Sequence, residues 1–172
     1  MSINWTFFPR NKKAPAELIE TIGVFNKHEK DIDSASHQYH SDEVLAILAG
    51  DFEALGYRVE KSKKKEDKIR VPVLFGENGK EEIAFEADAY HPEWEIVMEV
   101  EAGRALVNYQ FLKDFYESCM MEGVKYSVIA VRNKYKTSYD YKRICDFINN
   151  MYLSERVSVP LDGILILVFL LA

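Results

Sequence analysis

The chain has 172 residues, of which 48% are hydrophobic, 13% aromatic and 29% charged. This length and composition predict one folded domain with a continuous core, and they exclude an intrinsically disordered chain. The formal net charge of −6 argues against a protein that coats nucleic acid without specificity, because such binding depends on an excess of lysine and arginine.

The ends of the chain and its two cysteines argue against a secreted protein, a membrane protein and a zinc protein. Residues 1–10 lack the apolar segment of a secretory signal, so we expect a cytoplasmic protein. The apolar run at residues 164–171 is too short to cross a membrane and predicts a buried strand. Cys119 and Cys145 lack the close spacing of zinc ligands or disulfide frameworks, and no zinc site is expected.

Two helices are predicted in the first third of the chain. Residues 14–31 place apolar side chains three and four positions apart, and Pro15 suits the first turn of a helix. Residues 44–55 carry a second apolar stripe at helical spacing, and Gly56 is expected to end that helix.

Short segments with alternating or β-branched apolar residues predict the strands. They cover residues 57–60, 69–75, 83–90, 94–101, 126–131 and 163–169. Helical spacing returns after Gly103 and predicts helices over residues 106–119 and 139–151. A block of strands followed by strands that alternate with helices predicts an α/β fold, with a mixed central sheet flanked by helices.

Two of these strands gather acidic residues. In residues 83–90 the odd positions are apolar, and in residues 94–101 the apolar face has even numbers. If the two strands form a hairpin that buries both apolar faces together, the opposite face carries four carboxylates. These are Glu86, Asp88, Glu99 and Glu101.

Four neighbouring carboxylates predict a divalent cation site. Like charges across a strand pair raise one another's pKa unless a positive group lies between them. Mg²⁺, with Mn²⁺ as a possible substitute, binds one or two carboxylates together with water and phosphate oxygens. The alternative is that these acids are the solvent-exposed face of an amphipathic hairpin, since such clusters mark functional sites only in part of the cases.

The sequence around these acids resembles the active-site motif of the PD-(D/E)XK nuclease superfamily. Ten residues separate Asp88 from Glu99, which begins the run Glu99-Val-Glu101-Ala-Gly-Arg104. In that superfamily an Asp on one strand and a (D/E)-x-K motif on the next hold metal at a phosphodiester. Here Glu101 replaces the lysine, as in a subset of restriction enzymes with Glu-x-Glu, whose second Glu is taken to bind metal or orient the attacking water.

The resemblance covers roughly residues 36–131 and implies a restriction-endonuclease-like core. Residues 1–34 would then be an N-terminal helical extension, and residues 132–172 a C-terminal helix and strand. The residues that the resemblance implies as metal ligands and catalytic residues are Asp88, Glu99 and Glu101, and those that it implies as supporting residues are Glu86 and Glu43.

Basic residues near these acids are candidates for contacts with nucleic acid. Arg104 follows the Glu-x-Glu strand, and its guanidinium is suited to binding a phosphate. The run Lys63, Lys64 and Lys65 is expected to contact the DNA backbone, with a solvated loop as the alternative.

These observations and the resemblance predict a Mg²⁺-dependent endonuclease, a hydrolase that cuts double-stranded DNA. Because cutting a duplex needs two active sites, we expect a homodimer, with the helix at residues 14–31 as a candidate interface. Two alternatives remain open. One is a catalytically inactive nucleic-acid-binding or assembly module on the same fold, and the other is a nuclease for RNA or branched DNA.

Overall fold

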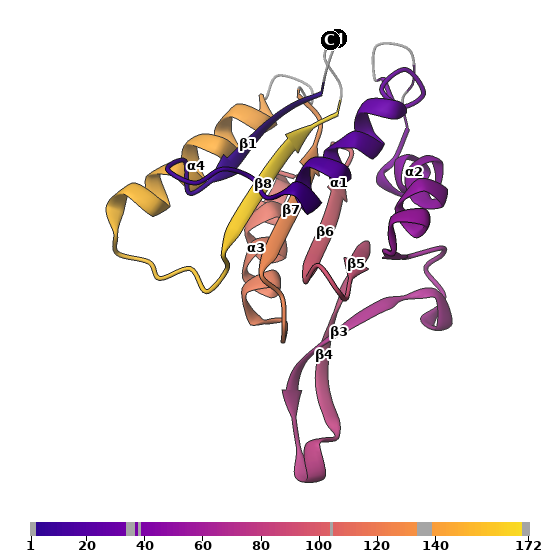
Figure 1. Ribbon diagram of the computed structural model, residues 1–172, viewed down its shortest axis with the longest axis vertical. Coiled ribbons are helices and arrows are strands. Elements are labelled where there is room, and N and C mark those ends of the chain that lie inside the picture. Colours follow the sequence, from indigo (N-terminus) through magenta and orange to yellow (C-terminus); the bar gives the residue numbers. More distant parts are fainter. Residues whose placement is uncertain (1–2, 34–36, 38, 104, 134–138, 170–172) are drawn as a thin grey trace.

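A six-stranded mixed sheet forms the centre of the computed structural model, which describes residues 3–33, 37, 39–103, 105–133 and 139–169 (Figure 1). In order across the sheet, its strands are β1 (Asn4–Phe8), β8 (Gly163–Val168), β7 (Tyr126–Val131), β6 (Ile96–Glu101), β5 (Ala89–His91) and β2 (Arg58–Val59). The β6–β7 and β7–β8 pairs are parallel, and the other pairs are antiparallel.

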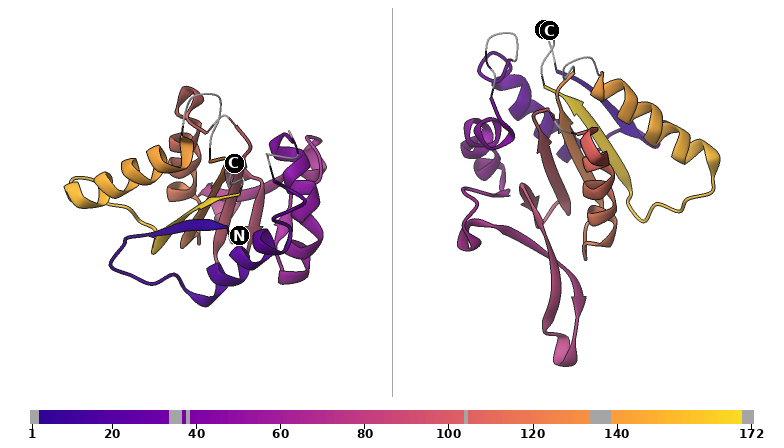
Figure 2. Two further views of the ribbon diagram at one scale, coloured as in Figure 1. Left: turned by 90° about the horizontal axis from the view of Figure 1, so that it is seen from above. Right: turned by 180° about the vertical axis from the view of Figure 1, so that it is seen from behind.

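Helices cover both faces of this sheet (Figure 2). They are α1 (Ala16–Lys27), α2 (Ser41–Leu55), α3 (Gln110–Met120) and α4 (Asp140–Ser154), with short 3-10 turns η1 (Lys65–Asp67), η2 (Glu77–Gly79) and η3 (Val107–Tyr109). Alternate residues of β7 face opposite layers: Val128 packs in the core cluster with α1 and α2, and Ile129 packs in the cluster with α3 and α4. The predicted mixed sheet flanked by helices is therefore confirmed.

The remaining strands, β3 (Ile69–Phe75) and β4 (Glu81–Ala87), pair only with each other. They form a two-stranded ribbon that extends away from the body of the protein, and we call residues 69–87 the arm (Figure 1). At the base of the arm, Val71 and Ala87 are buried in a small cluster with Val97 and Met121. The arm is thus anchored at one end only.

The structure corrects the predicted hairpin of residues 83–90 with 94–101. The first segment is divided at Asp88, because β4 pairs with β3 and only β5 pairs with β6. Ala87 packs at the base of the arm whereas Ala89 packs with Met98, so the prediction that the two alanines share a face is wrong. The odd-to-even register is confirmed where the pair forms, since Ala89 lies opposite Met98.

The N-terminal segment is more deeply integrated than the sequence predicted. Residues 4–8 form β1, an unpredicted strand that pairs with β8 at the edge of the sheet. The apolar side of α1 is buried in the core, where Phe25 contacts the rings of Phe52 and Phe169. The buried residues of α1 therefore belong to the core, and a role of this helix in a dimer interface stays a prediction.

The C-terminal end of α2 follows the prediction. Gly56 adopts a left-handed conformation with φ of 108°, and its N–H bonds to the carbonyl oxygen of Glu53. The buried His91 bonds through Nε2 to the Leu55 carbonyl oxygen, 2.9 Å away. This contact ties the end of α2 to β5. Among the described residues, we find no helix with the length and hydrophobicity required to span a membrane.

Candidate functional site

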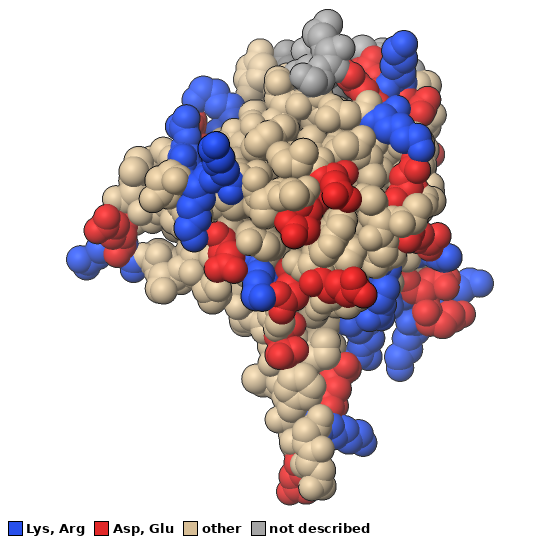
Figure 3. All heavy atoms as spheres, in the orientation of Figure 1, with Lys and Arg blue, Asp and Glu red and all other residues tan. Residues whose placement is uncertain are grey.

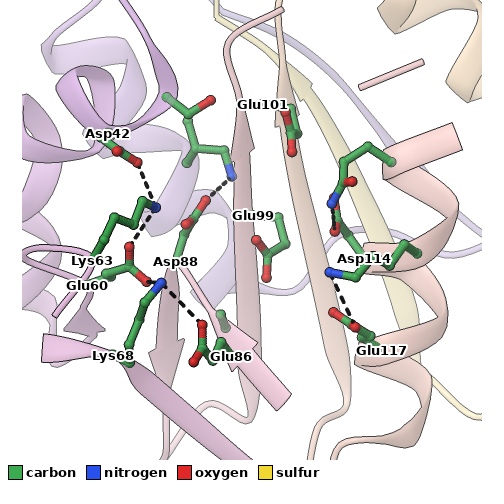
Figure 4. A pocket seen from close by; sticks show the side chains of 15 residues that line it. Asp42, Glu60, Lys63, Lys68, Glu86, Asp88, Glu99, Glu101, Asp114 and Glu117 are labelled. Atoms are coloured by element: carbon green, nitrogen blue, oxygen red, sulfur yellow. Dashed lines mark hydrogen bonds and ion pairs between the residues drawn. The ribbon is translucent and has the colours of Figure 1, made fainter. Parts of the chain in front are cut away.

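Asp88, Glu99 and Glu101 face one cavity of about 310 Å³ between α2, the base of the arm and α3 (Figure 4). Glu99 and Glu101 lie on the β6 face opposite to Met98 and Val100, which are buried on the α1 and α2 side. Asp88 is the residue between β4 and β5, where the chain passes from the arm into the central sheet. The three acids of the predicted metal site are therefore brought together.

The position of Asp88 is set by hydrogen bonds to its neighbours. Its Oδ2 accepts a hydrogen bond from the Val100 N–H at 2.8 Å, and its carbonyl oxygen accepts one from the Glu60 N–H at 2.8 Å. Burial raises the pKa of Asp88 to about 6, although the Val100 hydrogen bond and the charge of Lys63 act in the opposite direction. One carboxylate oxygen is thus held by backbone, and the group is oriented towards the cavity.

The surroundings of Glu99 disfavour the charged form of its carboxyl group. Burial raises its pKa well above the usual range, and the charges of Asp88 and Asp114 raise it further. Within the described residues, no hydrogen bond or ion pair engages its carboxylate, which lies between Asp88 and Asp114 in Figure 4. A half-buried carboxylate beside other acids is unfavourable, so a positive ligand here would be stabilising.

Lysines form the wall of the cavity next to α2 and the arm. Glu60 is 8% exposed and accepts hydrogen bonds from Lys63 at 2.7 Å and from Lys68 at 2.8 Å. Lys63 also pairs with Asp42 at 2.9 Å, and Lys68 with Glu86 at 3.2 Å. Both lysines thus pair with acids of their own wall, and among the described residues Asp88 and Glu99 form no ion pair.

Helix α3 supplies the opposite wall. Asp114 is 5% exposed, and its Oδ1 accepts a hydrogen bond from Gln110 Nε2 at 2.8 Å. Its Oδ2 is buried and has no hydrogen-bond partner among the described residues. Burial raises the pKa of Asp114 to about 6. Glu117 and Lys113 also line the cavity from this helix.

Of the other predicted site residues that the structure describes, some line the cavity and others lie outside it. Glu86 lines the cavity at the base of the arm. Glu43 does not line it: its side chain accepts a hydrogen bond from the His40 N–H at 2.7 Å and caps α2, whereas the preceding residue, Asp42, faces the site. Of the lysine run, Lys63 lines the cavity while Lys64 and Lys65 are exposed outside it, and Arg104 lies outside the described residues.

Several cavity residues were not predicted from the sequence. They are Asp42, Glu60, Lys68, Lys113, Asp114 and Glu117. The signal for Asp114 was present in the pattern, because it stands between Phe111 and Phe115 on the buried side of α3. A carboxylate at an apolar position of an amphipathic helix breaks the expected pattern and marks a residue with a special role.

The donor set of the cavity fits a hard divalent cation in an open site. Carboxylate oxygens predominate among the lining groups, and oxygen ligands are those that Mg²⁺ and Mn²⁺ prefer. In the part of the chain that the structure describes, no three acids, histidines or cysteines form a ready ligand set for a metal ion. A cation bound by Asp88 and Glu99 would therefore complete its coordination with water or substrate oxygens, as is usual for Mg²⁺.

Comparison with models of known protein families gives no match, and comparison with curated proteins gives no similar sequence. The function is therefore inferred from the chemistry of the cavity.

Proposed function

We propose that the protein is a divalent-metal-dependent endonuclease that hydrolyses DNA phosphodiester bonds, a Glu-x-Glu variant of the restriction-endonuclease-like enzymes. The observation that carries the proposal is the convergence of Asp88 and Glu99 on one cavity, where burial and mutual repulsion leave their charges uncompensated. A divalent cation would balance the negative charges of these acids, and the acids would hold the cation at the scissile phosphodiester bond.

Each acid has a distinct role in this proposal. Asp88 is oriented by the Val100 N–H, which leaves its second oxygen for the cation. Glu99 supplies the second ligand from the middle of β6, and Glu101, two residues further on the same face, binds the cation or accepts a proton from the attacking water. Mg²⁺, when bound, lowers the pKa of a water molecule and stabilises the charge that develops on the phosphate.

The charges of the lining residues support dependence on a cation. Eight carboxylates and three lysines line the cavity. A phosphodiester brought into this excess of negative charge is repelled unless a divalent ion is present. Lys63 acts on Asp88 by favouring its charged form. Lys113 is 62% exposed at the cavity wall, where it is suited to contact a backbone phosphate beside the scissile one.

The proposal is tested by incubating the pure protein with plasmid and oligonucleotide DNA in Mg²⁺, in Mn²⁺ and in chelator. We expect cleavage with either cation and none with chelator. Asp88→Asn and Glu99→Gln are expected to lower the cleavage rate at least about a hundredfold, because each removes a charged ligand and preserves side-chain shape. Glu20→Gln, an exposed acid of α1 outside the cavity, is the matched control and should retain full activity.

The variants also separate the proposal from its alternatives. Equal activity of wild type, Asp88→Asn and Glu99→Gln would show that the catalytic assignment is wrong. Binding of DNA without cleavage under any cation would indicate a nucleic-acid-binding or assembly module. Cleavage of RNA or of branched DNA in preference to linear duplex would keep the site and change the substrate.

A further inference from the structure

The arm carries an apolar stripe whose outer half is uncovered. On one face, Val71 lies opposite Phe85, and further out Leu74 lies opposite Ile83. Val71 is 1% exposed at the base, whereas Leu74 is 54% and Ile83 42% exposed. Phe75, next to Leu74, is 48% exposed. The face that is buried at the base of the arm thus continues outwards as an apolar surface in water.

The described residues leave this surface uncovered, because the outer arm extends away from the other elements in Figure 1 and in the right view of Figure 2. A two-stranded ribbon alone is only marginally stable, and large exposed apolar side chains on a ribbon are typical of an interaction surface. The tip also carries acids. Glu77 and Glu82 are exposed and form no ion pair among the described residues, while Glu81 pairs with Arg70 at 2.7 Å.

A groove with the complementary character lies on the α1 side of the sheet edge. It has a volume of about 540 Å³ and is lined by apolar side chains of β1 and α1, among them Trp5 and Ile19, which are 39% and 46% exposed. Its rim carries three basic residues, Arg10, Lys12 and Lys13. Among the described residues, no acid forms an ion pair with any of the three. We call this the β1–α1 groove.

We propose that two copies of this chain associate by inserting the arm of each into the β1–α1 groove of the other. The exposed apolar residues of the arm tip, Leu74, Phe75 and Ile83, cover Trp5 and Ile19. The exposed acids Glu77 and Glu82 meet the bases of the groove rim, of which Lys12 also donates a hydrogen bond to the Asp162 carbonyl oxygen. Two reciprocal contacts of this kind close a two-fold dimer, the commonest symmetry of homo-oligomers.

The charge of the arm favours a protein partner over nucleic acid. A two-stranded ribbon has the dimensions to enter a DNA groove, but such ribbons lie among phosphates. The outer arm presents Glu77, Glu81 and Glu82 against Lys80, an acidic balance that phosphates would repel. In Figure 3 the arm is largely tan with red and blue patches on its outer part, and most Lys and Arg of this face lie on the body of the protein.

The oligomeric state in solution tests the proposal independently of any enzymatic activity. Sedimentation velocity on the full chain is expected to show a concentration-dependent dimer that weakens with added salt. The double variant Leu74→Ser/Phe75→Ser is expected to weaken dimerisation at least about tenfold. Leu153→Ser, which replaces a side chain that is 72% exposed on α4, is the matched control and should leave the dimer unchanged. Circular dichroism verifies that each variant is folded.

A reciprocal charge reversal makes the test specific for this contact. Lys12→Glu/Lys13→Glu and Glu77→Lys/Glu82→Lys should each be monomeric, because every arm then meets a groove of like charge. An equimolar mixture should form a heterodimer, since one of its contacts is native and the other is complementary with both signs reversed. The reversed residues are exposed, so these variants are expected to fold.

Three results would overturn the proposal. One is a chain that stays monomeric at all concentrations and salt conditions. Another is a dimer that is unaffected by the arm and groove variants. The third is a pair of charge-reversed variants that do not associate on mixing. Binding of DNA by the arm in place of a second copy would overturn the proposal in the same way.

Discussion

At the scale of single residues, the lysine run shows how neighbouring identical side chains acquire different roles. Lys63, although itself 60% exposed, lines the cavity and bonds to the buried Glu60, whereas Lys64 and Lys65 lie outside the cavity. The sequence pattern treats the three as equivalent, because nothing in a run of identical residues indicates which one turns inwards. The ion pairs of Lys63 with Asp42 of α2 and with Glu60 distinguish it from its neighbours.

Lys63→Met is therefore expected to lower the free energy of unfolding by about 1–2 kcal/mol, because the buried Glu60 keeps only Lys68 as a partner. The same variant should reduce cleavage, since Lys63 favours the charged form of Asp88. Lys64→Met is the matched control and should change stability by less than about 0.5 kcal/mol. Chemical denaturation measures both variants, and equal effects of the two would contradict this assignment.

A second residue, His28, couples stability to pH. Its pKa is raised above 6.5, chiefly because its ring hydrogen-bonds to Asp51, with Nε2 and Oδ2 2.6 Å apart. Since the folded-state pKa lies above the unfolded value, protonation of His28 stabilises the fold fully below pH 6.5. That stabilisation is lost as the pH rises through the folded-state pKa.

We therefore expect part of the free energy of unfolding to be lost as the pH rises above 6.5, and His28→Gln to abolish that part of the loss. Denaturant unfolding at several pH values measures it. Replacement of another histidine, His37→Gln, should leave the pH profile unchanged. A profile that is identical in wild type and His28→Gln would show that the interaction with Asp51 does not affect stability.

At the scale of elements, the edge strand β1 is the clearest case of structure that its own sequence did not predict. Residues 4–8 are too few and too weakly alternating to indicate a strand. They become one because β8 offers an unpaired edge and because Gly163 lets β1 approach closely. A Cβ atom at Gly163 would overlap the ring of Phe7 and lie 2.9 Å from the carbonyl oxygen of Phe8.

Gly163→Ala is accordingly expected to lower the free energy of unfolding by about 1–3 kcal/mol, by forcing β1 away from β8. Gly50→Ala provides the opposite control: a Cβ there meets no atom within 4 Å, and alanine is the better helix former, so α2 should gain about 0.5–1 kcal/mol. Thermal unfolding compares the two. Stabilisation by Gly163→Ala would mean that β1 does not lie against β8.

Other elements were predictable because their local pattern and tertiary environment agree. Strands β3 and β7 have the predicted bounds, and Gly56 ends α2 as expected. The division at Asp88 was not predictable, because the alternation of residues 83–90 continues unbroken through it. The competition between β3 and β6 for pairing with this segment decides where one strand ends and the next begins.

At the scale of the whole molecule, the proposed function depends on how charge is distributed over the protein. The chain has a net charge of −6, and the cavity itself contains eight carboxylates and three lysines. The proposed function therefore predicts a weak long-range attraction of DNA, with a divalent cation in the cavity supplying the attraction at short range.

We expect DNA binding, measured by fluorescence anisotropy, to be weak in chelator and at least about tenfold tighter with Ca²⁺, an oxygen-binding cation used here to support binding without turnover. Glu99→Gln should reduce this enhancement, and Glu20→Gln should preserve it. Tight binding in chelator would show that the cavity is not the place where DNA is held.

The sequence by itself determined the layers of the fold and indicated that Asp88 and Glu99 face the same side of the sheet. Hydrophobic periodicity and strand alternation are local properties of the chain, so they can be read from the sequence. The tertiary structure alone decided the remaining walls of the cavity, because Glu60, Asp114 and Lys68 come from segments far apart in sequence. It also decided that the arm leaves the sheet. The pairing of strands depends on competition among long-range contacts, and a local sequence pattern does not predict which pairing forms.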